Sequence, residues 1–296
     1  MSLEKLHASE HQVLAVVTIP DKAQGRGQKL RPSPVKQFAA EHGLDLLQPV
    51  HLKEQDFIGR LRACGADAFV VVAFRILPPE VFTIPPLGTI NVHASLLPKY
   101  RGAAPINWAL INGEVQTGVT TMRIDARVDT GNILLQDTQE ITPDMNAGQL
   151  HDLLAEKGAN LLIKTLDRLQ SGTLIPSVQD ESMVSKAPKI TKELARIDFS
   201  GSARSVHNLI RGLNPYPAAY CMHEELQLKL LKSVPIERAE AGHPAGRIVY
   251  VGNDFFDVAC SSGAVRIYEV QLQGKKRLNV RDFLNGYTLK EGDFLR

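Results

Sequence analysis

The first 172 residues alternate between short apolar runs and segments with helical spacing, after a short opening helix that Ser2 is expected to cap. The apolar runs are typical of buried strands, which we expect at residues 13–18, 68–73, 88–93, 117–124 and 133–141. Helical spacing predicts helices at residues 34–42, 56–64, 105–112 and 150–169. Strands that alternate with helices predict an α/β domain with a Rossmann-like parallel sheet.

The pattern changes near residue 173. Residues 173–192 contain several Ser, Pro and Lys residues without a clear period, which predicts a linker. After a helix at residues 202–213, short strands separated by turns predict a small all-β barrel. These strands are expected at residues 227–231, 246–251, 256–260 and 265–272. We therefore expect an α/β domain at residues 1–172, a linker at residues 173–192 and a barrel domain at residues 193–296.

Composition alters this picture little. The chain has 296 residues, of which 44% are hydrophobic and 22% charged, as in ordinary globular proteins. No apolar run approaches the ~20 residues of a membrane-spanning helix, so we expect no membrane partner. The three cysteines are far apart and have no cluster of metal ligands near them, which predicts no metal site and favours the cytoplasm. A net charge of +2 does not by itself indicate nucleic-acid binding.

Candidate chemistry gathers in residues 91–105, which read NVHASLLPKYRGAAP. Asn91 and His93 are two residues apart, so on a strand they lie on the same face. An amide can donate a hydrogen bond to a developing oxyanion, and an imidazole titrates near neutral pH. Both residues stand where a buried strand opens into a loop, the place where open α/β sheets bind their ligands. A lone Asn-x-His would more often be an ordinary strand end with a hydrogen-bonded histidine.

The longer segment resembles the signature of formyltransferases that use N10-formyltetrahydrofolate, in which Asn-x-His is followed by SLLPxYRGxxP. The matching residues are Ser95, Leu96, Leu97, Pro98, Tyr100, Arg101, Gly102 and Pro105. The resemblance implies a catalytic set of Asn91, His93 and Asp129, the last at the head of Asp-Thr-Gly. A carboxylate beside an imidazole favours the imidazolium and fixes the tautomer.

The same resemblance implies 10-formyltetrahydrofolate as co-substrate and no metal. It places the folate against largely main-chain groups near residues 70–78 and near residues 125–129, and against the signature itself. The candidate folate contacts are Ser95, Leu96, Leu97, Pro98, Val72 and Ile76. The sequence departs from the family at Arg75, where relatives carry a glycine and one further residue, so Arg75 is not placed among the candidate contacts.

The second half of the chain indicates which branch of the formyltransferases the sequence resembles. Residues 189–220 are similar to the start of the carboxyl-terminal domain of the methionyl-tRNA formyltransferase family. That family has a Rossmann-like catalytic domain, a linker and an OB-type barrel that binds tRNA. The resemblance implies transfer of a formyl group to the α-amine of initiator methionyl-tRNA, which gives N-formylmethionyl-tRNA for translation initiation. We also expect the protein to act as a monomer.

Basic residues at two places are candidates for tRNA binding. Residues 20–36 (PDKAQGRGQKLRPSPVK) resemble the insertion loop of this family, which implies tRNA contacts by Arg26, Lys29 and Lys36. Lys275 and Lys276 near the other end form a second candidate patch. Cationic side chains supply most of the affinity for a phosphate backbone, although such charge runs are also common on solvated surfaces.

One part of the family pattern is not found. Family members open with a strand and a GTPxFA-type turn, whereas this sequence begins at the helix that follows them. The resemblance therefore implies that residues 1–172 lack the first strand, which would leave an unpaired strand edge inside a core. We expect low stability and little activity from residues 1–296 alone.

Two alternatives remain open at this point. A sugar-nucleotide formyltransferase shares the Asn-x-His signature and the two-domain plan, although it needs no basic insertion loop. A catalytically dead RNA-binding relative would fit the missing strand, although Asn91, His93 and Asp129 are all present. Folate binding without turnover would distinguish the dead relative from an enzyme.

Overall fold

The chain folds into two compact units, and the computed structural model describes residues 1–24, 29–236 and 242–296. The amino-terminal unit comprises Met1–Arg101, Gly118–Gln139 and Leu153–Lys186, and the carboxyl-terminal unit comprises Gly102–Thr117, Glu140–Asp152 and Ala187–Arg296. This division differs from the expected boundary at residue 172. The reason is that helix α5 (Pro105–Ile111) packs against helix α7 (Ala203–Leu213), where the Asn107 side-chain amide donates to the Gly212 carbonyl at 2.7 Å.

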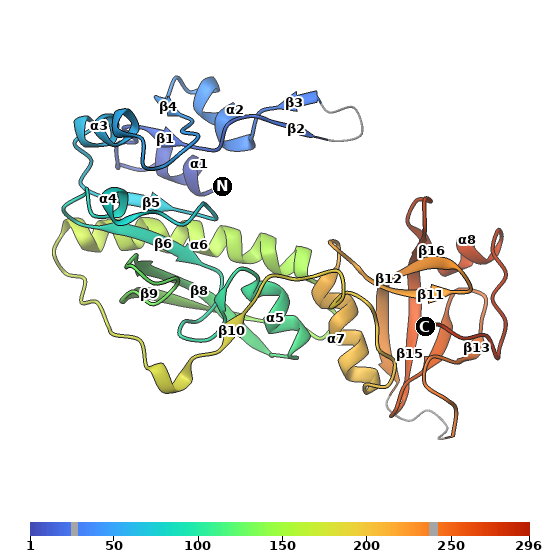
Figure 1. The fold of residues 1–296 in the computed structure, drawn as a ribbon. Coiled ribbons are helices and arrows are strands. Elements are labelled where there is room, and N and C mark those ends of the chain that lie inside the picture. The colour runs from blue at the N-terminus through green and yellow to red at the C-terminus, as the bar shows by residue number, and fades with distance from the viewer. Residues whose placement is uncertain (25–28, 237–241) are drawn as a thin grey trace. The chain divides into compact units, whose positions relative to one another are not determined.

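Helices surround the sheets of the amino-terminal unit (Figure 1). They are α1 (Ser2–His7), α2 (Pro34–Glu41), α3 (Gln55–Ala63), α4 (Pro79–Phe82) and most of α6 (Ala147–Gln170). Helix α2 begins where expected, because the Ser33 hydroxyl accepts from the Lys36 backbone N–H and proline occupies the first turn. The expected Ser2 cap is wrong: Met1 is the N-cap of α1 and makes no side-chain cap bond, because Ser2 already lies inside the helix.

Strands of the amino-terminal unit form two separate main sheets. The strands are β1 (Val16–Val17), β4 (Leu46–Leu47), β5 (Phe69–Val71), β6 (Thr89–His93), β8 (Gln116–Arg123) and β9 (Ile133–Glu140). Strands β1 and β4 pair with each other, and the second sheet has the order β5-β6-β8-β9. The expected parallel pairing is confirmed for β1–β4 and for β5–β6, whereas β6 and β8 are antiparallel.

The basic segment at residues 20–36 contains strand pairing as well as loop. Strand β2 (Lys22–Gln24) pairs antiparallel with β3 (Lys29–Arg31), with Ala23 opposite Leu30. The insertion loop expected at residues 20–36 therefore contains a pair of strands, and residues 25–28 between them lie outside the described residues. The pairing satisfies backbone groups that a long loop would leave to water.

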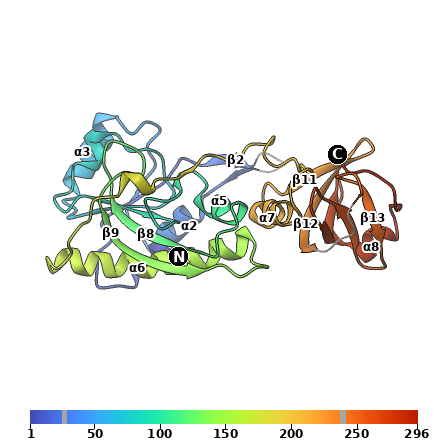
Figure 2. The same cartoon turned by 90° about the horizontal axis from the view of Figure 1, so that it is seen from below.

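Two apolar clusters hold the amino-terminal unit together. One gathers Phe57, Ile58 and Leu61 of α3, with Val17 and Phe69 packed against it from β1 and β5. The other joins Ile90, Leu134 and Leu162, so α6 covers one face of the second sheet (Figures 1 and 2). Phe69 and Val70, successive residues of β5, face different clusters, because successive side chains of a strand point to opposite faces.

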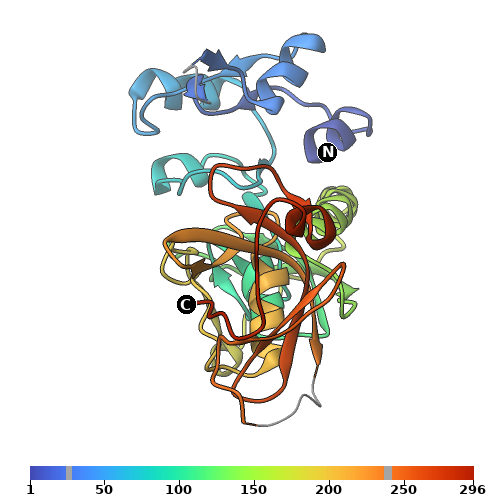
Figure 3. The same ribbon diagram turned by 90° about the vertical axis from the view of Figure 1, so that its right-hand side faces the viewer.

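The carboxyl-terminal unit is an antiparallel barrel with helices, as Figure 3 shows. Its strands are β11 (Ala219–His223), β12 (Leu226–Ile236), β13 (Ile248–Val251), β14 (Phe256–Ala259), β15 (Ala264–Leu272) and β16 (Leu278–Asn279). They follow the order β11-β12-β15-β14-β13, with β16 on β15. The expected all-β barrel is confirmed, with one addition: helix α8 (Val280–Leu284), capped by Asn279, was not anticipated.

The last residues of the chain bridge the two edges of this six-stranded sheet. The Ile248 N–H donates to the Asp293 carbonyl and the Leu295 N–H donates to the Gly246 carbonyl, both at 2.8 Å. At the opposite edge the Arg296 N–H donates to the Met222 carbonyl at 2.8 Å. The barrel is therefore closed by its own terminal segment, which leaves fewer unpaired edge groups.

The segment expected as a featureless linker has fixed contacts. Ser177 and Ile133 exchange two backbone hydrogen bonds, at 2.8 and 2.9 Å. A 3₁₀ turn (Glu181–Met183) follows, and β10 (Lys186–Ala187) pairs with β7 (Arg101–Gly102). We call residues 177–185 the strap, because they cross from β9 to the loop that follows β6.

Candidate active site

Asn91 and His93 lie at the carboxyl end of β6, in the interior of the second sheet. Asn91 is in register with Val71 on β5 and with Met122 on β8, so strands flank it on both sides. His93 is 6% exposed and faces Thr120 across the sheet in register. The predicted common face of the two side chains follows from their spacing on one strand. The sheet therefore fixes both functional groups on a rigid element.

The structure brings His93 and Asp129 together. The distance from His93 Nδ1 to Asp129 Oδ2 is 3.7 Å, and both side chains are nearly buried, at 7% and 11% exposed. The other ring nitrogen, Nε2, lies 3.0 Å from the Tyr100 carbonyl oxygen. A carbonyl can only accept, so Nε2 carries a proton.

This arrangement determines how the pair can handle protons. With Nε2 protonated, a neutral His93 directs the lone pair of Nδ1 toward the Asp129 carboxylate, whereas the imidazolium directs an N–H toward it. The 3.7 Å separation is longer than a hydrogen bond but close enough for strong charge attraction. The two side chains are therefore arranged so that a proton on Nδ1 points toward a carboxylate, a geometry that acid–base chemistry can use.

A tight loop holds Asp129, and we call residues 125–131 the Asp129 loop. Asp129 has a φ of +56°, in the left-handed region that costs a non-glycine residue energy. The Asp125 carboxylate accepts from the Arg127 N–H at 2.9 Å and from the Thr130 hydroxyl at 2.7 Å. At Gly131 a Cβ would lie 1.6 Å from the Arg123 carbonyl oxygen, so only glycine fits there. The glycine of Asp-Thr-Gly is thus required by backbone geometry.

We call the loop after β6, residues 94–101, the signature loop. Of its four candidate folate contacts, two are buried and two are partly exposed. Ser95 and Leu97 are buried. The Ser95 hydroxyl donates to the Lys99 carbonyl at 2.6 Å, and the Leu97 carbonyl accepts from Gln136 at 2.9 Å. Leu96 and Pro98 are partly exposed. The side chain of Ser95 therefore supports the loop, while Leu96 and Pro98 retain surface that a ligand could cover.

Val72 and Ile76 lie after β5, at the same end of the sheet as His93. They are unusually exposed for apolar side chains, at 44% and 79%. Between them Arg75 donates to the carbonyls of Pro49 and Val50, each at 2.8 Å. Arg75, which departs from the family pattern, thus anchors this loop to residues 49–50, and no local sequence signal indicated that role.

The candidate tRNA-binding residues have different surroundings. The Lys36 ammonium lies 2.8 Å from Asp21 Oδ2, and this bond lowers the pKa of the Asp21 carboxyl. Lys275 and Lys276 are exposed in the turn between β15 and β16. Arg26 lies outside the described residues, and only the backbone of Lys29, in β3, is described. Lys275 and Lys276 therefore show the clearest exposed charge of the set.

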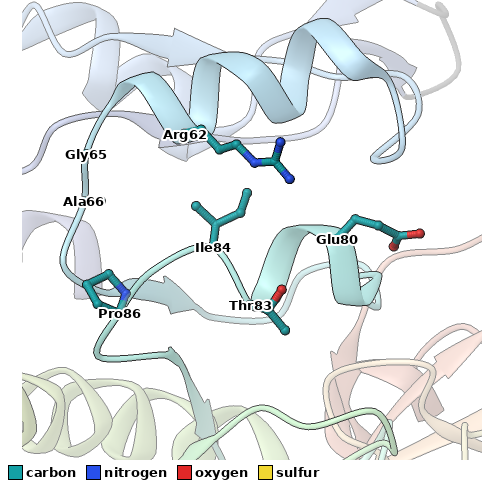
Figure 4. A pocket seen from close by; sticks show the side chains of 7 residues that line it. All are labelled: Arg62, Gly65, Ala66, Glu80, Thr83, Ile84 and Pro86. Carbon is teal, nitrogen blue, oxygen red and sulfur yellow. The ribbon is translucent and has the colours of Figure 1, made fainter.

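A surface depression of about 510 Å³ lies at the opposite ends of the strands (Figure 4). Its lining residues are Arg62, Gly65, Ala66, Glu80, Thr83, Ile84 and Pro86. These residues precede β5 and β6 or belong to α3 and α4, whereas the predicted site residues follow those strands. This depression contains none of the candidate catalytic groups.

The described part of the chain adds two further observations. It contains no group of three or more His, Cys, Asp or Glu side chains arranged to hold a metal ion. None of its helices combines the length and the apolar character needed to cross a membrane.

Comparison with known proteins decides the family. The pattern described as formyl transferase matches residues 1–166, and that described as formyl transferase, C-terminal domain, matches residues 189–288. A methionyl-tRNA formyltransferase of Geobacter metallireducens is 48% identical, over 98% of this chain and 93% of the relative. One from Ruminiclostridium cellulolyticum is 45% identical, over 99% and 95%. The chain belongs to the methionyl-tRNA formyltransferase family.

Solved structures agree on the fold. The N-formyltransferase of Helicobacter canadensis, solved with folinic acid and dTDP-3-aminofucose, superposes with a TM-score of 0.66 at 22% identity, covering 94% of each chain. HypX of Aquifex aeolicus, solved with tetrahydrofolic acid, gives a TM-score of 0.61 at 18% identity, over 87% of this chain and 47% of that one. Likenesses at this identity confirm the formyltransferase fold alone. Formyltransferases of this family use folate-derived formyl donors.

Proposed function

We propose that this protein transfers the formyl group of 10-formyltetrahydrofolate to the α-amine of initiator methionyl-tRNA, in the cytoplasm and as a monomer. The product would be N-formylmethionyl-tRNA for translation initiation. The observation that carries the proposal is the pairing of His93 with Asp129 at 3.7 Å, next to Asn91, in a chain 45–48% identical to methionyl-tRNA formyltransferases.

The chemistry follows from the three side chains. The neutral amine of the methionyl group attacks the formyl carbon, and negative charge develops on the formyl oxygen. Asn91 donates a hydrogen bond to that oxygen, an interaction whose loss typically costs ~10²–10³ in rate. The bond from the formyl carbon to N10 then breaks. The amine loses one proton and N10 gains one, so His93 and Asp129 need only accept a proton and return it.

The expected folate contacts are consistent with a flat aromatic ligand. Val72 and Ile76 offer exposed apolar surface where β5 ends, and Leu96 and Pro98 offer partly exposed surface on the signature loop. Apolar residues with a few polar groups are the usual lining of a small-molecule site. We propose that the pterin ring packs there, with Ser95 and Leu97 holding the loop in shape.

We propose that tRNA phosphates contact Lys275 and Lys276 on the barrel and Arg26, Lys29 and Lys36 on the basic hairpin. Lys36 would exchange its Asp21 partner for a phosphate, which costs an existing ion pair. Exposed lysines carry no such cost, so Lys275 and Lys276 are expected to contribute more.

The experiment that tests the function compares two acceptors. The protein is incubated with 10-formyltetrahydrofolate and either methionyl-tRNA or a nucleotide-linked amino sugar, and formylated product is quantified by mass spectrometry. The test is run on residues 1–296 and on a form extended upstream by one family strand. Formylation of methionyl-tRNA is the expected result, whereas formylation of the amino sugar alone would favour a sugar-nucleotide formyltransferase. Product from neither acceptor in either form would favour a dead RNA-binding relative.

A further inference from the structure

The strap places one buried amide between the two loops of the candidate active site. Gln179 is 5% exposed. Its Nε2 donates to the carbonyls of Asp129, at 3.0 Å, and Gly131, at 2.8 Å. Its Oε1 accepts from Arg101 Nε at 3.0 Å and from Arg101 Nη2 at 2.8 Å. Both donors and both acceptor positions of the amide are therefore used.

These bonds act on backbone that is otherwise unfavourable. Asp129 has a left-handed φ of +56°, a conformation that persists only where the surroundings impose it. The carbonyl of this strained residue and that of Gly131, two positions later, accept from the same amide nitrogen, which fixes the turn from outside. Asp125 and Thr130 close the loop from within.

The other side of the amide reaches the signature loop. The Arg101 side chain is 10% exposed, and its backbone N–H donates to the Ser185 carbonyl at 2.9 Å. The neighbouring Tyr100, whose carbonyl accepts from His93, donates its own N–H to the Ser185 hydroxyl at 2.9 Å. The strap thus holds the residue that orients His93 as well as the loop that carries Asp129.

We propose that Gln179 is a positioning residue that sets the separation and orientation of Asp129 relative to His93. This proposal rests on the proposed function and deepens it, because it assigns a role in formyl transfer to a segment expected to be a linker. Gln179 touches no reacting atom and acts through the Asp129 loop. A misplacement of about 1 Å in such a pair can cost ~10²-fold in rate.

Gln179→Glu tests the role with almost no change in volume. The carboxylate still accepts from Arg101, but it presents an acceptor to the two carbonyls in place of a donor. We expect the maximal rate of formyl transfer to fall about 10- to 100-fold, with the half-saturating concentrations of both substrates changed less than about twofold.

Glu181→Ala is the matched control. Glu181 is the other partner of Arg101, at 2.9 Å, but its side chain is 65% exposed, and it interacts with the Asp129 loop through its charge attraction to Arg127. We expect this variant to keep nearly the full rate. A rate loss in Gln179→Glu no larger than in Glu181→Ala would overturn the positioning role, as would a loss seen only in the half-saturating concentrations.

Crystal structures of the two variants supply a readout that needs no activity. In Gln179→Glu we expect the distance from His93 Nδ1 to Asp129 Oδ2 to change by about 0.5 Å or more, a displacement that matters at a functional site. In Glu181→Ala it should stay near 3.7 Å. An unchanged distance in Gln179→Glu would refute the proposal, whereas absence of formyl transfer by the wild-type protein would refute only the proposed function.

Discussion

The carboxyl-terminal sheet has both edges bridged by the end of the chain, whereas strands β1 and β5 of the amino-terminal unit each pair on one side among the described residues. Residues 293–296 hydrogen-bond to β13, to Gly246 just before it and to β11, and so close the barrel. Among the described residues, β1 pairs only with β4 and β5 pairs only with β6. The unit that carries the candidate active site is therefore the one whose sheet is interrupted.

The cores differ in the same way. One contiguous cluster fills the carboxyl-terminal unit, and Phe256, Val265 and Ile267 within it are fully buried. The amino-terminal unit has smaller clusters on either side of β5, and every residue of β5 remains partly exposed. Strand β5 is thus covered on both faces, while among the described residues its backbone pairs on one side only, with β6.

The largest expected effect comes from offering β5 a second neighbouring strand. An upstream extension with a five-residue apolar strand should stabilise the amino-terminal unit by roughly 3–6 kcal/mol if it buries two further apolar side chains. Hydrogen exchange of the β5 and β6 amides measures this, because local opening reports the stability of each unit separately. Exchange in β12 and β15 should not change.

An extension of equal length made of glycine and serine is the control for this prediction. It should leave the protection of β5 and β6 as it was, because it has no apolar side chains to bury. Equal protection from the two extensions would show that no strand is accepted between β1 and β5.

A second prediction concerns affinity for tRNA. Replacing Lys275 and Lys276 together by alanine should weaken methionyl-tRNA binding and reduce the slope of log affinity against log salt by about 2, one for each lost phosphate contact. Filter binding over a range of salt concentrations measures the slope.

Replacing Lys53 and Lys164, which are exposed lysines of the amino-terminal unit, makes the same change in net charge. The salt dependence should then stay close to that of the wild-type protein. Equal slopes for the two double variants would mean that the barrel turn makes no specific phosphate contact.

The smallest expected effect is a pH dependence confined to the carboxyl-terminal unit. Burial lowers the pKa of His207, whose Nδ1 lies 3.0 Å from the Ser233 hydroxyl and which has Arg211, Asp144 and Arg204 nearby. The unfolded chain therefore binds a proton at higher pH than the folded chain. Stability is complete above the unfolded pKa of about 6.5 and declines as the pH falls from there toward the lower folded pKa.

Urea unfolding followed by the fluorescence of Trp108, the single tryptophan, reports on this unit because Trp108 lies in α5. The wild-type midpoint should decrease between about pH 7 and pH 5. His207→Gln removes the titrating ring and should flatten that dependence. If the urea midpoint of His207→Gln depended on pH as the wild-type midpoint does, His207 would be excluded as the source of that dependence.

Elements with strong periodicity were predictable from the sequence. The leucine spacing gave α6, and the serine cap followed by proline gave the start of α2, because both signals are local. The hairpin of β2 and β3 was not foreseen, since glycine, proline and charged residues dominate that segment. The pairing of β1 with β4 in one sheet and of β5 with β6 in another could not be predicted, because hydrophobic pattern does not reveal which strands pair.

The candidate site was predictable in part for the same reason. Asn91 and His93 could be placed on one strand face from their spacing, whereas Asp129 needed the family resemblance. Gln179 and Arg75 act through partners 50 and 25 residues away, across contacts that only the tertiary structure creates. No local motif marks either residue, so the sequence alone does not indicate their roles.

The central claim is that the amino-terminal unit performs the chemistry while the carboxyl-terminal unit contributes affinity for tRNA. Single-turnover formylation of methionyl-tRNA by Asn91→Ala, over a range of tRNA concentrations, tests it most directly. The account predicts a maximal rate lowered by ~10²–10³ with the half-saturating tRNA concentration unchanged, because one oxyanion donor is lost and no phosphate contact is. An unchanged maximal rate, or a loss expressed only as weaker tRNA binding, would contradict it.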